Sequence, residues 1–239
     1  MGTGTERLRD AGHRAERATA ILDVAADLLL RHGYRRVTID DVAAGANIGK
    51  GTIYLHWKTR EQLFSAVFER EVLCAIDELR QALRQDPNVC LLHRFARTYF
   101  LAIVSRPLLR GFLLADAELL GKLITSRDTT RDDRHNAMSR AYLELLAEHG
   151  LLRDDMDIEE IRYAYQATFE GFLQQEAAAP ADGLDQRADL LARTVRRAFE
   201  SDRPAANTEL RDVAAAATAL LTDLINADRA ESGLHRNTG

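Results

Sequence analysis

Residues 37–64 read VTIDDVAAGANIGKGTIYLHWKTREQLF. Thr38 has the short hydroxyl side chain that caps a helix, and Asp41 stands three residues later, where a carboxylate can reach back to complete a capping box. Val37 and Val42 occupy the positions of the hydrophobic staple around such a cap. The stretch therefore predicts a short helix from Thr38 to about Gly45.

A tight turn and a second short helix follow. Asn47 tolerates the left-handed backbone conformation better than most residues, so it suits the turn. The next helix is expected from about Gly49 to Trp57, and the alanines around the turn let the two helices approach closely. The side chains that can form a small core are Ile39, Val42, Ile48 and Ile53. Two short helices joined by a tight turn form a helix-turn-helix, whose second helix enters the major groove of DNA.

Longer helices are expected on both sides of this motif. The first spans about Arg14 to His32, with one apolar face and with Gly33 able to close it. The other begins at Thr59, where Gln62 stands in capping-box position, and continues until Pro87 stops it. At the usual rise per residue, this helix is about 35 Å long and can connect two domains.

Composition and charge describe a globular chain with a basic head. Hydrophobic residues make up 46 % of the sequence and charged residues 29 %, which is the balance of a soluble protein. Neither a membrane span nor a signal peptide is recognisable, so we expect a cytoplasmic protein. The whole chain carries a net charge of −5. Residues 1–60 hold ten basic and seven acidic residues, whereas the remainder holds 22 and 30, which favours an anionic partner for the head alone.

From Ile21 to Phe68 the sequence resembles the DNA-binding domain of TetR-family transcriptional regulators. The matching segments are TIDDVA (38–43), KGTIYLHW (50–57) and KTREQLF (58–64). Three positions depart from the common pattern, where Asn47 replaces Gly, Gly49 replaces Ser and Trp57 replaces Phe. The resemblance implies an all-α fold with an N-terminal three-helix DNA-binding domain and a larger helical ligand-binding and dimerisation domain.

The resemblance also implies which residues contact DNA. Thr38, Tyr54 and His56 would contact phosphates, and Lys50 would reach base edges or a phosphate from the start of the recognition helix. Gly51 would allow the backbone to approach a base closely. The full set of expected contact residues is Thr38, Gly49, Lys50, Gly51, Thr52, Tyr54, Leu55, His56, Lys58 and Arg60.

Several of these residues have a second interpretation. Tyr54 could be a core aromatic, His56 a helix cap, and Arg60 the partner of a nearby carboxylate. Trp57 is expected in the core. The N-terminal arginines could form an arm that touches the minor groove, or a solvated tail; they are Arg7, Arg9, Arg14 and Arg17.

Beyond Pro87 the chain predicts further helices, broken at Pro107, Gly150, Pro180 and Pro204. Their expected ranges are 89–105, 107–125, 128–149, 157–178, 184–201 and 205–230. The predicted organisation is an arm (1–13), a DNA-binding domain (14–60), an effector-binding and dimerisation domain (61–230) and a tail (231–239). The last helix could cap a dimer interface or cover a ligand cavity.

Helices of this kind can enclose a largely apolar effector cavity with a few polar groups. Its candidate residues are His93, Arg97, Tyr99, Phe100, Phe112, Glu118, His135, Tyr142, Tyr165 and Phe169. Cys90 and His93 share a helical face but lack a third ligand, so no metal site and no cofactor are expected.

Apolar stripes on the helices at 157–178 and 184–201 predict a dimer interface, through which two subunits close a four-helix bundle. Its expected residues are Ile161, Tyr165, Phe172, Leu191, Val195 and Phe199. The alternative is that these stripes pack within one subunit.

Together these features predict a homodimeric transcriptional repressor that binds a palindromic operator and is released by a small-molecule effector. The alternative is a similar DNA-binding protein that is controlled by a protein partner or has no effector. We do not expect an enzyme, because the sequence has no Gly-rich phosphate loop, no GxSxG and no HExxH motif.

Overall fold

The protein was analysed as a computed structural model that describes residues 4–114, 129–176, 179 and 182–231, with side chains outside 4–11 and 111–130. The chain divides into two compact units. The first contains the residues up to Glu71 and, among the described residues, those from Asn226 onward, and the second contains Val72–Ala115 and Asp128–Ile225. Within the described residues, regular structure is entirely helical, as the sequence predicts.

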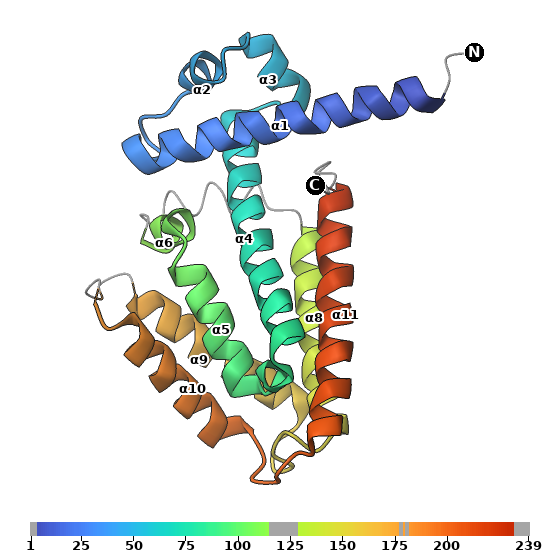
Figure 1. The fold of residues 1–239 in the computed structure, drawn as a ribbon. Helices are drawn as coiled ribbons and strands as arrows, with labels where there is room; N and C mark the ends of the chain where they lie inside the picture. The colour runs from blue at the N-terminus through green and yellow to red at the C-terminus, as the bar shows by residue number, and fades with distance from the viewer. Residues whose placement is uncertain (1–3, 115–128, 177–178, 180–181, 232–239) are drawn as a thin grey trace. The chain divides into compact units, whose positions relative to one another are not determined.

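The first unit is built from the helix-turn-helix and its flanking helices (Figure 1). Its elements are α1 (Gly4–His32), α2 (Ile39–Gly45), α3 (Lys50–His56) and the first turns of α4 (Arg60–Gln85). Leu22, Val42, Ile53 and Phe64 are fully buried and form its core. Gly45 lets α2 lie close to α1, because a Cβ atom at this position would come within 2.7 Å of the Val24 side chain.

Helix α1 begins well before the expected start at Arg14. Its backbone is helical from Gly4, so the arm expected over residues 1–13 is wrong from that residue onward. The physical reason is local propensity, because residues 6–11 read ERLRDA, which is mostly strong helix formers and contains no proline. Gly12 lies within the helix without breaking it.

Within its described residues, the second unit continues with α4 and contains a short 3-10 helix, η1, and six further helices, the last of which ends in the residues of the first unit. These are η1 (Pro87–Cys90), α5 (Leu92–Val104), α6 (Pro107–Leu114), α8 (Thr129–Glu148), α9 (Ile158–Gln175), α10 (Leu184–Phe199) and α11 (Asn207–Glu231). In Figure 1, α5 runs beside α9 and α10. The part of the expected helix at 107–125 that follows Leu114 lies outside the described residues.

Large apolar side chains from these helices form one continuous core. Phe100 and Leu143 are fully buried in it. Tyr142 stacks on Phe95 with ring centroids 4.2 Å apart, and its hydroxyl donates to the Cys90 carbonyl at 2.7 Å. The buried hydroxyl therefore has a partner, which offsets the cost of removing it from water.

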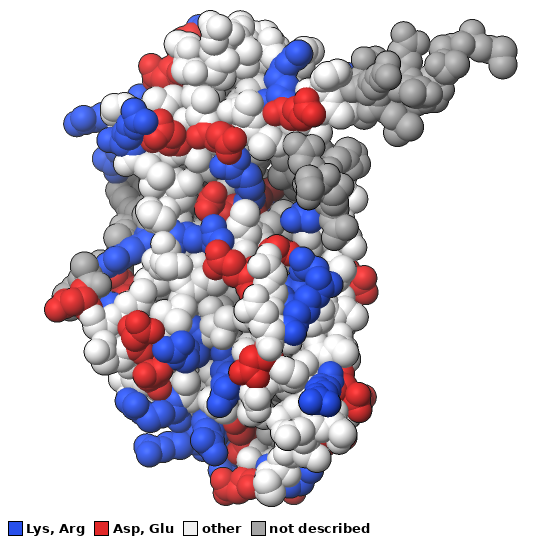
Figure 2. Space-filling model, in the orientation of Figure 1, with Lys and Arg blue, Asp and Glu red and all other residues white. Residues whose placement is uncertain are grey.

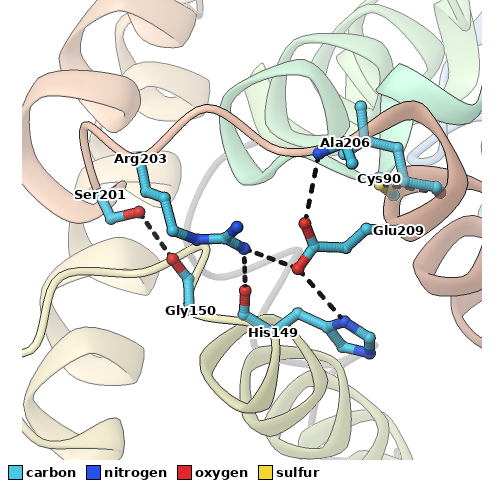
Figure 3. A network of polar contacts seen from close by, with 8 residues as sticks. Cys90, His149, Gly150, Ser201, Arg203, Ala206 and Glu209 are labelled. Carbon is cyan, nitrogen blue, oxygen red and sulfur yellow. Dashed lines mark hydrogen bonds and ion pairs between the residues drawn. The ribbon is translucent and has the colours of Figure 1, made fainter.

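A polar cluster joins the end of α8 to the start of α11 (Figure 3). Arg203 donates to the His149 carbonyl and to Glu209 Oε1, the latter at 2.6 Å, and the bond from Arg203 to the carboxylate lowers the pKa of Glu209. Ser201 donates to the Gly150 carbonyl at 2.7 Å. Gly150 has φ +60, which closes α8 in the left-handed conformation. The cluster thus fixes the segment that leads from α10 into α11.

No helix in the described part of the chain combines the length and the hydropathy that crossing a membrane requires.

Candidate nucleic-acid interface

The predicted capping box forms at the start of α2. Thr38 Oγ1 accepts from the Asp41 N–H at 3.3 Å, and the Asp41 carboxylate accepts from the Thr38 N–H at 2.8 Å. The Thr38 hydroxyl also donates to this carboxylate at 2.7 Å. These hydrogen bonds lower the pKa of Asp41. The Thr38 hydroxyl can therefore donate to a phosphate only after it leaves Asp41.

The turn between α2 and α3 depends on Asn47, the only non-glycine residue with positive φ in the described chain. Its φ is 53°, as the left-handed turn requires. The N–H of Ile48 donates to the Ala43 carbonyl at 3.0 Å, and that of Asn47 donates to Ala44 at 3.1 Å. This pair of bonds is a Schellman motif, which ends α2 and sets the direction of α3.

Helix α3 is held by one buried residue and presents its others to solvent. Ile53 is fully buried, whereas the side chains of Tyr54 and Leu55 are 42 % and 77 % exposed. The alternative that Tyr54 is a core aromatic is therefore wrong. Large apolar side chains left in solvent on a seven-residue helix indicate a surface that contacts another molecule.

Glycine at position 51 has no explanation within the chain. A Cβ atom there would meet nothing within 4 Å, and the backbone has no positive φ. A Cβ atom at Gly49, the N-cap of α3, would also meet nothing within 4 Å, but glycine is itself favoured over alanine at an N-cap. Since alanine would favour the helix more than glycine does, an approaching partner is the physical reason that remains for glycine at position 51.

The two lysines of the motif are engaged within the unit. Lys50 forms an ion pair with Asp40, and Lys58 Nζ donates to the Tyr54 carbonyl at 3.0 Å. Both side chains are exposed, so phosphate oxygens can compete for them. Gln62 accepts from the Lys58 N–H at 2.7 Å instead of from Thr59, whose hydroxyl accepts from the Gln62 N–H. The second predicted capping box therefore forms in part, because Thr59 caps the Gln62 N–H while the return bond goes to Lys58 and not to Thr59.

His56 is half-buried at the end of α3, where its ring lies 5.2 Å from that of Trp57. Burial lowers its pKa, and the charges of Arg14 and Arg17 lower it further. These arginines stand exposed on the regular part of α1, not on a tail. Trp57 is only partly buried, so its expected place in the core is wrong.

Arg60 turns inward, and its expected role on the DNA backbone does not fit its geometry. Its Nε donates to the Val37 carbonyl at 2.8 Å, and another guanidinium nitrogen donates to the Tyr34 carbonyl. The guanidinium carbon also lies 4.2 Å from the ring centre of Tyr34 and 5.1 Å from that of Phe64. Arg60 thus ties α4 to the loop before α2.

The candidate effector residues do not form a single set. Phe169 stacks on Tyr99 at 5.7 Å, meets the edge of Phe100, and lies 6.1 Å from Tyr165. Burial raises the pKa of Tyr99 to about 12. These four residues form the aromatic cluster of the second unit. Tyr142 belongs to the core described above.

The remaining effector candidates lie elsewhere. His93 and Arg97 form ion pairs with carboxylates of Glu200 and of α10, so they stand apart from the aromatic cluster. His135 stands half-buried on α8. The side chains of Phe112 and Glu118 lie outside the described residues. The described residues contain no group of three side chains that could hold a metal ion.

The expected dimer-interface residues mostly face the interior of one subunit. Ile161, Leu191, Val195 and Phe199 are at most 4 % exposed, while Tyr165 and Phe172 are half-buried. The prediction is wrong for the four buried residues, because their stripes meet α5 and the core. On the same two helices, Tyr163 is 76 % exposed and Leu190 is 48 % exposed.

The fold and the exposed α3 surface define a helix-turn-helix protein of the transcription-regulator class. Residues 21–67 match the family described as "Bacterial regulatory proteins, tetR family". The head of the chain thus carries a DNA-binding domain of the TetR family, which is a family of transcriptional regulators and not of enzymes.

Two curated relatives match the head of the chain. An uncharacterized HTH-type transcriptional regulator of Mycobacterium tuberculosis, Rv1556, is 40 % identical over 63 residues, which cover 26 % of this chain and 31 % of the relative. The DNA-binding transcriptional repressor TetR of Mycobacteroides abscessus is 38 % identical over 63 residues, covering 26 % and 33 %. The matched segment thus spans about a third of the length of these relatives.

A solved structure extends the similarity to the whole fold. The complex of SmeT with triclosan matches with a TM-score of 0.60 at 21 % identity, and the match covers 78 % of this chain and 93 % of that one. SmeT is described as the repressor of a multidrug efflux pump of Stenotrophomonas maltophilia. At this identity the likeness concerns the fold alone.

Proposed function

We propose that this protein is a DNA-binding transcriptional repressor that a small-molecule effector releases from its operator. The observation that carries the proposal is the surface of α3, which exposes Tyr54 and Leu55 and holds Gly51, where a Cβ atom would meet nothing within the chain. The Mycobacteroides relative is a repressor, which favours repression over activation. A target on chromosomal DNA also places the protein in the cytoplasm.

The protein would act as a homodimer, because a palindrome presents its two half-sites about 34 Å apart and needs two recognition helices. With the apolar stripes of α9 and α10 turned inward, the second copy would cover the opposite faces, around Tyr163 and Leu190. The double variant Tyr163→Glu/Leu190→Glu should sediment as a monomer. Tyr54→Glu/Leu55→Glu, which places the same charge on exposed apolar surface of α3, should remain dimeric. Unchanged sedimentation of the double variant would exclude this interface.

An apolar, aromatic effector is the best match to the aromatic cluster of Tyr99, Phe100, Tyr165 and Phe169. The triclosan complex of SmeT supports this chemistry by analogy of fold. A ligand shifts an equilibrium only through its different affinity for the two states. Helix α4 belongs to both units, so a ligand-induced shift of α4 would change the spacing of the recognition helices.

The test is binding to the DNA beside the protein's own gene, measured by fluorescence anisotropy over a range of salt concentrations. We expect binding to a palindrome there that weakens steeply with salt and that Tyr54→Ala reduces without altering the dimer. Equal affinity for a scrambled sequence would contradict the proposal. If the operator is bound but no aromatic compound releases it, control by a protein partner or the absence of an effector becomes the better reading.

A further inference from the structure

A groove of about 500 Å³ runs between α5 and α10 on the second unit. The two helices run antiparallel, as their ion pairs show. His93, at the start of α5, pairs with Glu200 just after α10, with Nδ1 2.8 Å from Oε2. Arg97, one turn further along α5, bonds to Asp189 at 2.6 Å and to Asp185 at 3.0 Å near the start of α10.

The groove is strongly basic. Arg94 and Arg97 line it from α5, and Arg193 and Arg196 line it from α10. Each pair is spaced i, i+3, so both members lie on the helix face that borders the groove. Asp189 is the only carboxylate among the lining residues. Figure 2 shows Lys and Arg side chains gathered over α10, at the lower left of the view.

Two of these arginines have no counter-charge. Arg97 is held by its aspartates, and Arg94 has Asp86 at 3.4 Å. The side chains of Arg193 and Arg196 form no hydrogen bond or ion pair with any described residue. Like charges three residues apart on a helix repel unless an anion lies between them. The residues after position 60 carry more acidic than basic side chains, so general composition does not account for this concentration of positive charge.

We propose that this groove binds a small organic ligand that carries a phosphate or polyphosphate group. The guanidinium fork donates two parallel hydrogen bonds to phosphate oxygens, and several arginines can surround one tetrahedral group. The Thr98 hydroxyl adds a neutral donor, while Val89 and Ala192 offer apolar surface to the organic part. The volume falls within the range of small-molecule sites, about 300–1,000 Å³.

This site is distinct from the one in the proposed function. Its lining holds no Phe, Tyr or Trp, whereas the aromatic cluster consists of them. It involves neither DNA nor an apolar effector, so its failure would leave the proposed function standing. Because a ligand here would join α5 to α10, binding should stabilise the unit and raise the Tm by about 2–6 °C at saturating concentration.

The test is calorimetric titration of the full chain, without DNA, with inorganic pyrophosphate and with citrate at constant ionic strength. We expect pyrophosphate to bind with a Kd below about 1 mM and about tenfold or more tightly than citrate. The double variant Arg193→Gln/Arg196→Gln should lose at least about tenfold in pyrophosphate affinity. Both side chains are exposed and unpaired in the structure, so the Tm without ligand should stay unchanged.

The matched control is Arg197→Gln/Arg211→Gln, which removes the same charge from exposed residues outside the groove. Arg197 lies on α10 next to Arg196, so it tests position and not only charge. Its affinity for pyrophosphate should stay within about threefold of the wild type. Absence of pyrophosphate binding, equal binding of citrate, or equal losses in the two double variants would each overturn the proposal.

Discussion

Large apolar side chains are treated in opposite ways in the two units. On α3, Tyr54 and Leu55 stand in solvent, whereas on α9 and α10 residues such as Ile161 and Phe199 turn into the core. A seven-residue helix that exposes such side chains gains nothing from them in the free protein, so they indicate contact with a partner. The buried residues stabilise one subunit. The following predictions test this contrast between the exposed side chains of α3, which we expect to bind a partner, and the buried side chains of α9 and α10, which stabilise the fold.

The largest effect is expected in the core of the second unit. Phe199→Ala removes a ring that is 4 % exposed and meets the edge of Tyr165, so unfolding should become easier by about 3–5 kcal/mol. Leu55→Ala should change the free energy of unfolding by less than about 0.5 kcal/mol, because its side chain is exposed. Chemical denaturation measures both. A comparable loss for the two variants would remove the contrast between α3 and α10.

Arg60→Met should lower the stability of the protein and leave the salt dependence of DNA binding unchanged. The variant loses two hydrogen bonds to carbonyls and the contact with the Tyr34 ring, at a cost of about 1–3 kcal/mol. Because we place Arg60 inside the unit, the slope of log affinity against log salt should not change. A slope that is smaller by about one would instead show that Arg60 contacts a DNA phosphate.

Gly51→Ala should separate folding from recognition. The added methyl group meets nothing in the chain, and the gain in helix propensity should stabilise the protein by up to about 1 kcal/mol. The same methyl group stands where DNA would approach, so operator affinity should fall by about tenfold. Melting curves and anisotropy, measured on the same preparation, test the expected rise in stability and the expected fall in operator affinity. Full affinity in this variant would show that DNA does not approach residue 51.

The smallest effect concerns the pH dependence at His56. Its pKa is lowered in the free protein, so the ring is neutral at pH 7 and its contribution to stability is lost as the pH falls below about 6.5. A phosphate beside the ring would raise the pKa again, and binding would then take up a proton. Operator affinity should therefore rise a few-fold between pH 8 and pH 6, and His56→Gln should remove that part of the rise. Identical pH profiles for the two proteins would place His56 away from phosphate.

The arrangement of the helix-turn-helix could be read largely from short-range sequence. Thr38 and Asp41 are three residues apart, and Asn47 closes the turn with bonds that span at most five residues. The inward turn of Arg60 could not be read in this way, because the carbonyls that accept its hydrogen bonds lie 23 and 26 residues earlier.

The candidate ligand sites depended still more on tertiary contacts. Arg193 and Arg196 are absent from the expected site residues, although their i, i+3 spacing matches that of Arg94 and Arg97. The spacing of the two arginine pairs indicates a shared groove only when α5 and α10 are known to be neighbours. In the same way, the periodicity of α10 predicts an apolar stripe but not whether the stripe meets its own core or a second copy.

The sequence by itself thus determined the helices, their caps, the helix-turn-helix and the TetR-family resemblance, because capping bonds, helical periodicity and turn conformations act within a few residues. The tertiary structure alone decided that the stripe of Leu191 and Val195 faces inward, that Arg60 is an internal tie, and that four arginines share one groove. The physical reason is that burial and ion pairing depend on neighbours in space, and these neighbours lie as far as a hundred residues away along the chain.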